Sequence, residues 1–281
     1  MHESEKSDSV VVAGKPTNKA ARAVAEPVEP RTGTKGNADQ QSTHRAQDRA
    51  SVSPALERVR QAARQRKKER FTALLHHVDL AMLRTAFYAM KRAAAPGVDG
   101  MTWEAYEADL DRRIEDLHAR VKSGAYRALP SRRSYIPKED GSTRALAVAA
   151  LEDKIVHRAT AAVMSAIYEE DFLGFSYGFR PGRSQHDALD ALIVGISSRK
   201  VNFILDADIR SFFTEVSQEW VVRFLEHRIG DRRIIRLVQK WLRAGVLQDG
   251  IVTVEEKGTG QGSVITPPTI LQTSTLPGTG R

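Results

Sequence analysis

The sequence predicts an α+β fold in which a helical N-terminal region precedes a region of mixed strands and helices. In residues 55–130, apolar side chains recur at helical spacing. From residue 131 onwards, short β-prone segments alternate with turns and with further helical segments. Before residue 55 the chain is rich in Ser, Thr, Ala, Gly, Pro and charge, and no aromatic residue occurs before Phe71. The predicted regions are 1–54, 55–130, 131–265 and 266–281.

The length and charge of the chain limit the classes of protein that it can represent. Its 281 residues suffice for one large domain or two small ones, and 41% hydrophobic residues suffice for a core. The net charge of +8 favours a polyanionic partner, with nucleic acid ahead of an acidic membrane. No apolar run approaches the roughly 18 residues that span a bilayer, and a signal peptide is not apparent. The absence of cysteine excludes disulfides and thiolate metal sites, and it fits a cytoplasmic location.

Residues 1–54 are predicted to form a disordered tail, because they cannot bury enough apolar surface to offset the entropy of ordering. A basic helix is then predicted from Ser53-Pro54 to Arg70. It carries seven cations and two acids, so its polar face is either simply solvated or in contact with phosphate. The candidate nucleic-acid contacts in this helix are Arg64, Arg66, Lys67 and Lys68.

Six further helices and two β-hairpins are expected. The predicted helices are 79–94, 102–117, 153–168, 184–196, 218–228 and 232–244. Thr102 and Ser184 are suited to cap two of them, and Asp231-Arg232-Arg233 is interpreted as another helix start without chemistry. The expected hairpins turn at residues 139–142 and at Asp249-Gly250. One apolar stripe is assigned to the core: Trp103, Tyr106, Leu110, Ile114 and Leu117.

The segment 202–213, NFILDADIRSFF, contains the most informative acidic residues. An apolar run, Phe203–Leu205, is predicted to form a strand that places Asp206 and Asp208 on one face. Two carboxylates at the end of a core strand are costly without a cation, and a divalent metal is the obvious candidate. The alternative is a strand that ends at the surface with solvated acids.

Two loops offer further candidate contacts. Arg180 and Arg183 supply fork-shaped donors for phosphate, and Tyr177 and Phe179 beside them are available for stacking, although a purely structural loop is also compatible. The glycine-rich loop 258–265 leaves its backbone open to close approach by a ligand.

The order of these blocks is more specific than any single one. YIPKEDGSTRAL, DKIVHRAT, FSYGFRPGRSQHDAL, ILDADIRSFF, RIGDRR and GTGQGSVI follow one another along the chain. Over about residues 78 to 266 the chain resembles the reverse transcriptases encoded by group II introns, which copy RNA into DNA and assist splicing as maturases. The resemblance implies reverse-transcriptase fingers and a partial palm, with intron RNA, a DNA primer or target and deoxynucleoside triphosphates as partners.

The resemblance also implies roles for individual residues. Asp208 matches the first metal-binding aspartate of the palm, with the backbone carbonyl of Ile209 beside it and Mg²⁺ as the cofactor, whereas Asp206 does not match a catalytic position. Two-metal phosphoryl transfer requires carboxylates at such a centre. Arg180 and Arg183 match the loop that holds template and primer. The residues matched to the incoming nucleotide are Lys138, Arg144, Phe213 and Gln261.

After Ile265 the sequence departs from the family pattern. The resemblance leads us to expect an apolar helix and then a strand bearing Tyr-X-Asp-Asp, whereas residues 266–281 contain no Asp-Asp pair. We interpret this segment as the product of a frameshift, and the chain as a truncated, catalytically incomplete copy. An incomplete palm sheet is expected to leave one face of Phe203–Leu205 poorly covered. Two alternatives stay open: a non-enzymatic module that binds intron RNA, and an unrelated basic helical scaffold that acts through protein partners.

Overall fold

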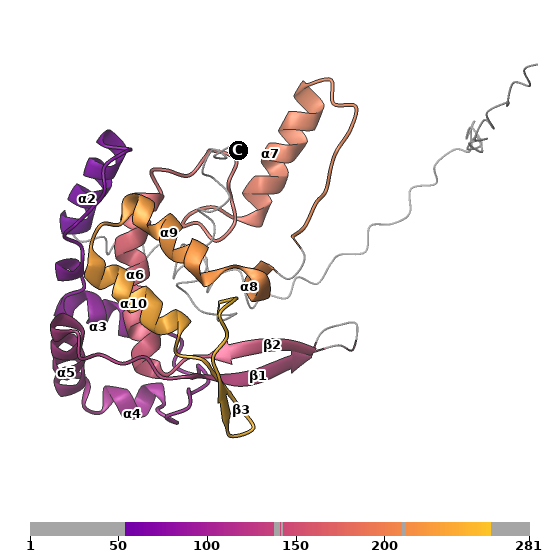
Figure 1. Ribbon diagram of the computed structural model, residues 1–281. Helices are drawn as coiled ribbons and strands as arrows, with labels where there is room; N and C mark the ends of the chain where they lie inside the picture. Colours follow the sequence, from indigo (N-terminus) through magenta and orange to yellow (C-terminus); the bar gives the residue numbers. More distant parts are fainter. Residues whose placement is uncertain (1–53, 138–140, 142, 210–211, 260–281) are drawn as a thin grey trace, which may run out of the picture.

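The computed structural model describes residues 54–137, 141, 143–209 and 212–259. The helices gather around α6 (Leu151–Tyr168), and a small sheet lies at one end of this helical body (Figure 1). The predicted tail, apart from Pro54, and the predicted region 266–281 lie outside the described residues. Among the helices that are described, none is both long and apolar enough to cross a bilayer.

The N-terminal region is helical, as predicted, but its helices have different bounds. They are α2 (Pro54–Gln65), the 3₁₀ turn η1 (Leu75–His77), α3 (Leu80–Tyr88), α4 (Trp103–Glu107) and α5 (Leu110–Ser123). The side chains of Asp79 and Thr102 cap α3 and α4, as they accept from the backbone N–H groups of Met82 and Ala105. The single predicted helix 102–117 is therefore two helices. The predicted stripe from Trp103 to Leu117 is nevertheless buried throughout.

The helix α6 forms the centre of the core. Ile155, Val163 and Ile167 are fully buried, and α2 and α3 both pack against this helix. The helices α9 (Gln218–Arg228) and α10 (Arg232–Leu242) contribute to the same core, and the Tyr168 hydroxyl donates to the carbonyl of Leu225 at 3.2 Å.

Asp231 confirms the predicted helix start. Its carboxylate caps α10 and also accepts from the backbone N–H groups of Leu74 and Leu75, at 2.8 and 3.0 Å. Burial would raise the pKa of Asp231, but the hydrogen bonds from Arg233, Leu74 and Leu75 outweigh it and lower the pKa to about 2. This carboxylate therefore ties α10 to the N-terminal region.

The sheet consists of two antiparallel hairpins joined by a short parallel pairing. Its strands are β1 (Ser131–Pro137), β2 (Thr143–Val148), β3 (Val246–Gln248) and β4 (Ile251–Thr253), in the order β2-β1-β3-β4. Both predicted hairpins are confirmed. In the second, Asp249 and Gly250 have φ of +51° and +80°, which a two-residue type I′ turn requires.

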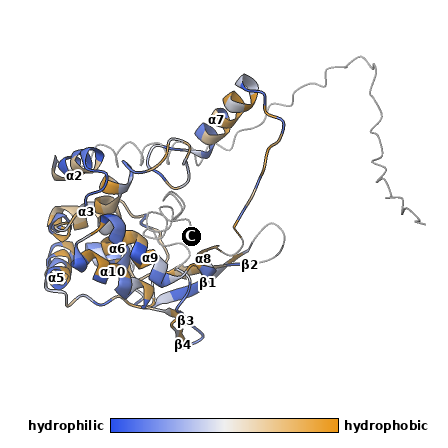
Figure 2. Cartoon of the chain, turned by 45° about the horizontal axis from the view of Figure 1, so that its top comes forward, coloured by the Kyte–Doolittle hydropathy of each residue, from blue (hydrophilic) through white to orange (hydrophobic). Residues whose placement is uncertain are grey.

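The segment after α7 (Gln185–Ser198) differs most from the prediction. Ser184 caps α7 as expected, through a reciprocal pair of hydrogen bonds with Asp187, and α7 projects away from the helical body (Figure 1). Residues 201–209, however, have no regular secondary structure, so the predicted strand at Phe203–Leu205 is wrong. A strand needs backbone partners, and within the described parts of the chain no strand pairs with this segment. Phe203 and Leu205 are consequently 92% and 90% exposed (Figure 2 shows this segment crossing open space).

Candidate functional site

Asp208 lies at the end of the extended segment 201–209, close in sequence to α8 (Phe212–Glu215). Asp206, Asp208 and Ile209 are all exposed there. Because this segment is not a strand, the prediction that Asp206 and Asp208 lie on one strand face is wrong. Among the residues that the structure describes, no three histidine or acidic side chains cluster as metal ligands.

Mg²⁺ commonly binds one or two carboxylates together with water and substrate phosphates. One carboxylate with the Ile209 carbonyl beside it could contribute to a single such ion. Phosphoryl transfer with two ions requires further carboxylates between them. The described residues therefore do not fit a complete two-ion centre, and Asp208 as a catalytic metal ligand stays a prediction.

Phe213 is joined to the start of the glycine-rich loop. The backbone N–H of Thr259 donates to the carbonyl of Phe213 at 2.8 Å, and that of Gly258 donates to Val216 at 2.7 Å. Gly258 has φ of +80°, and a Cβ there would lie 2.9 Å from the carbonyl oxygen of Thr214. Glycine is thus required for this close approach. The loop that leads to Gln261 begins beside Phe213, although Gln261 itself lies outside the described residues.

Arg144 lies near the tip of the first hairpin. It is paired with Ile136 across the β1–β2 ladder, one position from the last pair, Pro137 and Thr143, and its side chain is exposed. Lys138 follows Pro137 directly but lies outside the described residues. In Figures 1 and 2, α8 lies beside this hairpin, so the elements bearing Phe213 and Arg144 are neighbours.

Arg180 is committed to contacts within its own loop and with the end of α6. Its Nη2 lies 3.1 Å from the carboxylate of Glu169, and its Nη1 donates to the Ser176 carbonyl at 2.7 Å. The guanidinium also lies over the Phe172 ring, at 4.7 Å from its centre, and the side chain is only 7% exposed. In this conformation Arg180 holds the loop in place. Its predicted contact with template and primer stays a prediction.

The neighbouring side chains of this loop are more open. Arg183 lies over the Tyr177 ring, at 5.1 Å from its centre, and donates to the Gly174 carbonyl. Phe179 is exposed, with a positive φ of 56°. Phe179 is therefore accessible for stacking, whereas Tyr177 is partly covered by Arg183.

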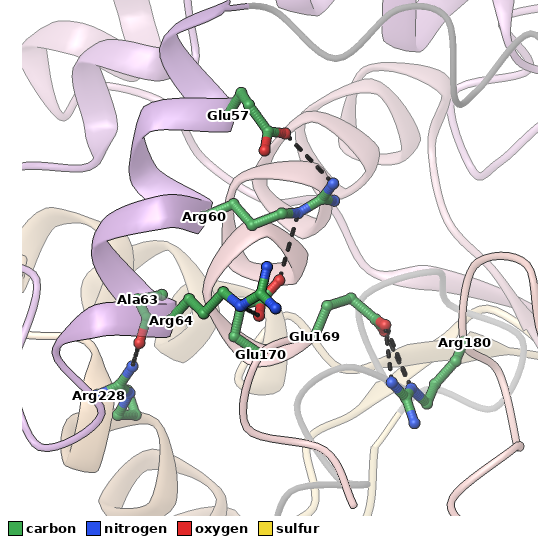
Figure 3. Close-up of polar contacts among 8 residues, drawn as sticks. All are labelled: Glu57, Arg60, Ala63, Arg64, Glu169, Glu170, Arg180 and Arg228. Atoms are coloured by element: carbon green, nitrogen blue, oxygen red, sulfur yellow. Dashed lines mark hydrogen bonds and ion pairs between the residues drawn. The ribbon is translucent and has the colours of Figure 1, made fainter. Parts of the chain in front are cut away.

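The basic candidates at the end of α2 are exposed. Arg60 and Arg64 both lie 4.0 Å from the carboxylate of Glu170, and Arg66 pairs with Glu69 in the following turn (Figure 3 shows the first two). Arg64 is nevertheless 79% exposed, and Lys67 and Lys68 are exposed as well. Such contacts are weak in solvent, so these cations can exchange them for phosphate.

A buried arginine determines where α2 ends. The Arg228 guanidinium donates to the carbonyls of Ala63, Arg66 and Glu69, and its Nε lies 2.9 Å from Asp171 (Figure 3 shows the Ala63 contact). A cation at the C-terminus of a helix satisfies carbonyls that have no partner within the helix. The predicted helix to Arg70 therefore ends at Gln65.

Sequence reasoning missed the function of the acidic run that follows α6. Glu169, Glu170 and Asp171 each meet an arginine from a different part of the chain. Three adjacent acids in a basic chain were the available signal, because buried or half-buried arginines need such partners. Glu169 and Asp171 hold the loop of Arg180 and the helix α9 against the end of α6, whereas the contact of Glu170 with α2 is longer and more exposed.

Comparisons with known proteins place part of this chain in a family. Residues 136–274 match the family described as reverse transcriptase (RNA-dependent DNA polymerase). The chain is 36% identical over 180 residues to YkfC of Escherichia coli, which covers 63% of this chain and 47% of YkfC. It is 27% identical over 217 residues to the group II intron-encoded protein LtrA of Lactococcus lactis, which covers 75% of this chain and 35% of LtrA.

A protein encoded in a cob intron of Schizosaccharomyces pombe is 33% identical over 170 residues, which cover 60% of this chain and 20% of that protein. The chain thus spans about half of YkfC and about a third of LtrA. These relationships contradict the alternative of an unrelated basic scaffold. Residues 136–274 belong to the reverse transcriptase family, and the chain is related to group II intron-encoded proteins such as LtrA.

Proposed function

We propose that this chain is the fingers and part of the palm of an RNA-directed DNA polymerase of a mobile group II intron, and that it binds the intron RNA. The observation that supports this most is the family match over residues 136–274, which includes the end of β1, all of β2, the Asp208 segment and the glycine-rich loop in order. The likeness to LtrA adds group II intron RNA as the partner.

In this proposal, Asp208 and the carbonyl of Ile209 contribute to one Mg²⁺ site, and Arg144, Phe213, Lys138 and Gln261 contact the incoming nucleotide. Lys and Arg side chains offset charge on the leaving pyrophosphate in such reactions. The 281 residues contain no Asp-Asp pair, so one matched carboxylate cannot hold two divalent ions. This chain by itself is therefore proposed to be catalytically incomplete.

Primer extension on an RNA template tests the catalytic part of the proposal. The purified chain is incubated with template, DNA primer, Mg²⁺ and labelled nucleotides, beside an Asp208→Ala variant as the matched control. We expect both proteins to incorporate labelled nucleotide only at the background level of a reaction without protein. Incorporation above that of the variant would show a working polymerase and would overturn the incomplete-copy interpretation.

A second candidate function is a non-enzymatic RNA-binding module. It is favoured by the exposed cations at the end of α2, which are free to contact phosphate. Binding to a structured RNA at several salt concentrations tests it, since counterion release makes phosphate binding weaken steeply with salt. Replacing Arg64, Arg66, Lys67 and Lys68 with Gln is expected to reduce both affinity and salt dependence. Salt-independent binding would exclude this function.

A further inference from the structure

The helix α10 presents a polar face made almost entirely of cations. Between residues 232 and 243 the sequence RRIIRLVQKWLR contains five cations and no acid. Its apolar residues, Ile234, Ile235, Leu237 and Val238, are buried in the core. The cations occupy five of the other eight positions of the helix and its C-cap: Arg232, Arg233, Arg236, Lys240 and Arg243.

Two of these five cations hold the fold. Arg233 pairs with the capping carboxylate of Asp231 at 3.0 Å, and Lys240 donates to the carbonyls of Gly124 and Tyr126. Arg232, Arg236 and Arg243 are exposed, and their side chains have no ion pair or hydrogen bond with any described residue. These three arginines, which we call the α10 row, extend over about 16 Å of helix.

The α10 row contrasts with three exposed arginines of the helical body that do have acidic partners. Arg84 pairs with Asp111, Arg112 with Asp109 and Arg223 with Glu219. Like charges four residues apart on a helix repel each other, so unpaired Arg232 and Arg236 weaken α10 slightly. A row of arginines without ion pairs to the described residues is therefore an unfavourable arrangement for a merely solvated surface.

A hollow lies at the N-terminal end of α10, beside Arg233. It has a volume of about 260 Å³ and is lined by Arg233 together with residues of η1, α5 and the segments beside them. Leu75, Val78 and Val121 form its apolar part, and Lys122 and His118 add basic groups. The acid in its lining, Asp79, is used to cap α3 at the N–H of Met82.

We propose that the α10 row and this hollow form a docking surface for an RNA phosphate backbone, in addition to the basic end of α2. The inference rests on the proposed RNA-binding function and adds a second contact surface to it. Guanidinium groups bind phosphate through paired donors, and such contacts need no particular base sequence. A membrane surface is disfavoured, because an interfacial helix inserts its apolar face, and that of α10 is buried in the core.

The test compares two variants with the same loss of charge. One carries Arg232→Gln, Arg236→Gln and Arg243→Gln in the α10 row. The control carries Arg84→Gln, Arg112→Gln and Arg223→Gln, at exposed arginines that already have acidic partners. Circular dichroism and thermal unfolding of both variants verify that each one folds.

Equilibrium binding to a structured RNA is measured for the wild type and both variants over a range of salt concentrations. The α10 variant is expected to lose at least about tenfold in affinity at low salt, and its salt slope should fall by about 2. The control variant is expected to stay within about twofold of the wild type. Equal affinities and slopes for the two variants would overturn the inference.

Further arms separate this inference from the proposed function and from other partners. If the wild type binds RNA and the α2 variant alone loses affinity, only the α10 surface is refuted. If the wild type shows no salt-dependent RNA binding, both proposals fail. Binding to duplex DNA in place of RNA shows whether any phosphate backbone suffices. Binding to polyglutamate is measured as well, as a probe for an acidic protein partner. If the α10 variant lost affinity for polyglutamate but not for RNA, the partner would be an acidic protein and the RNA assignment would be overturned.

Discussion

The backbone N–H of Thr259 donates a hydrogen bond to the carbonyl oxygen of Phe213, over 2.8 Å. This contact joins two segments that are 46 residues apart and that the family resemblance assigns to the same nucleotide site. Gly258 makes the contact possible, since its positive φ and missing side chain let the loop approach α8.

Replacing Gly258 with Ala is expected to destabilise the protein by about 1–3 kcal/mol, because a positive φ strains alanine and the new Cβ would meet the Thr214 carbonyl oxygen at 2.9 Å. Gly250→Ala is the matched control, since Gly250 also has φ of +80° but open space around it. Urea unfolding should show the larger loss for Gly258→Ala. Equal losses would mean that the contact with α8 contributes nothing beyond the strained φ.

Arg228→Met is expected to destabilise the protein by about 3–5 kcal/mol, because it leaves Asp171 and three carbonyl groups without their buried cationic partner. Limited proteolysis should then cut near the end of α2. Adding Asp171→Asn to this variant should recover part of the loss in chemical unfolding. Arg223→Gln, at an exposed surface pair, is the control and should change stability by less than about 1 kcal/mol.

The low pKa of Asp231, about 2, predicts an acid-sensitive contribution to stability. The carboxyl group of Asp231 loses its proton at a lower pH in the folded state than in the unfolded state. Its contribution to the free energy of unfolding is therefore present above pH 4 and is lost as the pH falls toward 2. The stability difference between wild type and Asp231→Asn should shrink by about 2 kcal/mol over that interval. Urea unfolding at pH 5, 4, 3 and 2 measures it.

The control for this pH series is Glu115→Gln, which changes an exposed carboxylate without a partner among the described residues. The difference in the free energy of unfolding between this variant and the wild type should not shrink between pH 4 and pH 2. A pH-independent difference for Asp231→Asn would mean that its hydrogen bonds do not favour the ionised form.

The exposed side chains of Phe203 and Leu205 predict self-association of the isolated chain, because apolar groups on an unpaired extended segment can pair with another copy. The double change Phe203→Ser and Leu205→Ser is expected to reduce light scattering at high concentration. Since neither side chain is buried, the free energy of unfolding should change by less than about 0.5 kcal/mol.

An Ile251→Ser variant, at an exposed position of β4, provides the comparison. If it lowers scattering as much as the double variant, association does not depend on the segment 201–209. A large loss of stability in the double variant would instead show that this segment is packed in solution.

Local sequence signals predicted most elements correctly. The capping side chains of Thr102 and Ser184, the Asp249-Gly250 turn and the apolar stripe from Trp103 to Leu117 all act within a few residues. Such features depend on hydrogen bonds and side-chain spacing that a short window contains. The order of the motifs likewise sufficed to predict the reverse transcriptase family.

The sequence by itself determined the helical segments, the two hairpins and the family. The tertiary structure alone decided that Arg228 binds carbonyls at and just after the end of α2, that Arg180 faces Glu169, and that residues 203–205 are not a strand. The physical reason is shared by all three. Helix ends, buried charges and strands are completed by partners that are distant in sequence, and only the folded chain shows which partners are within reach.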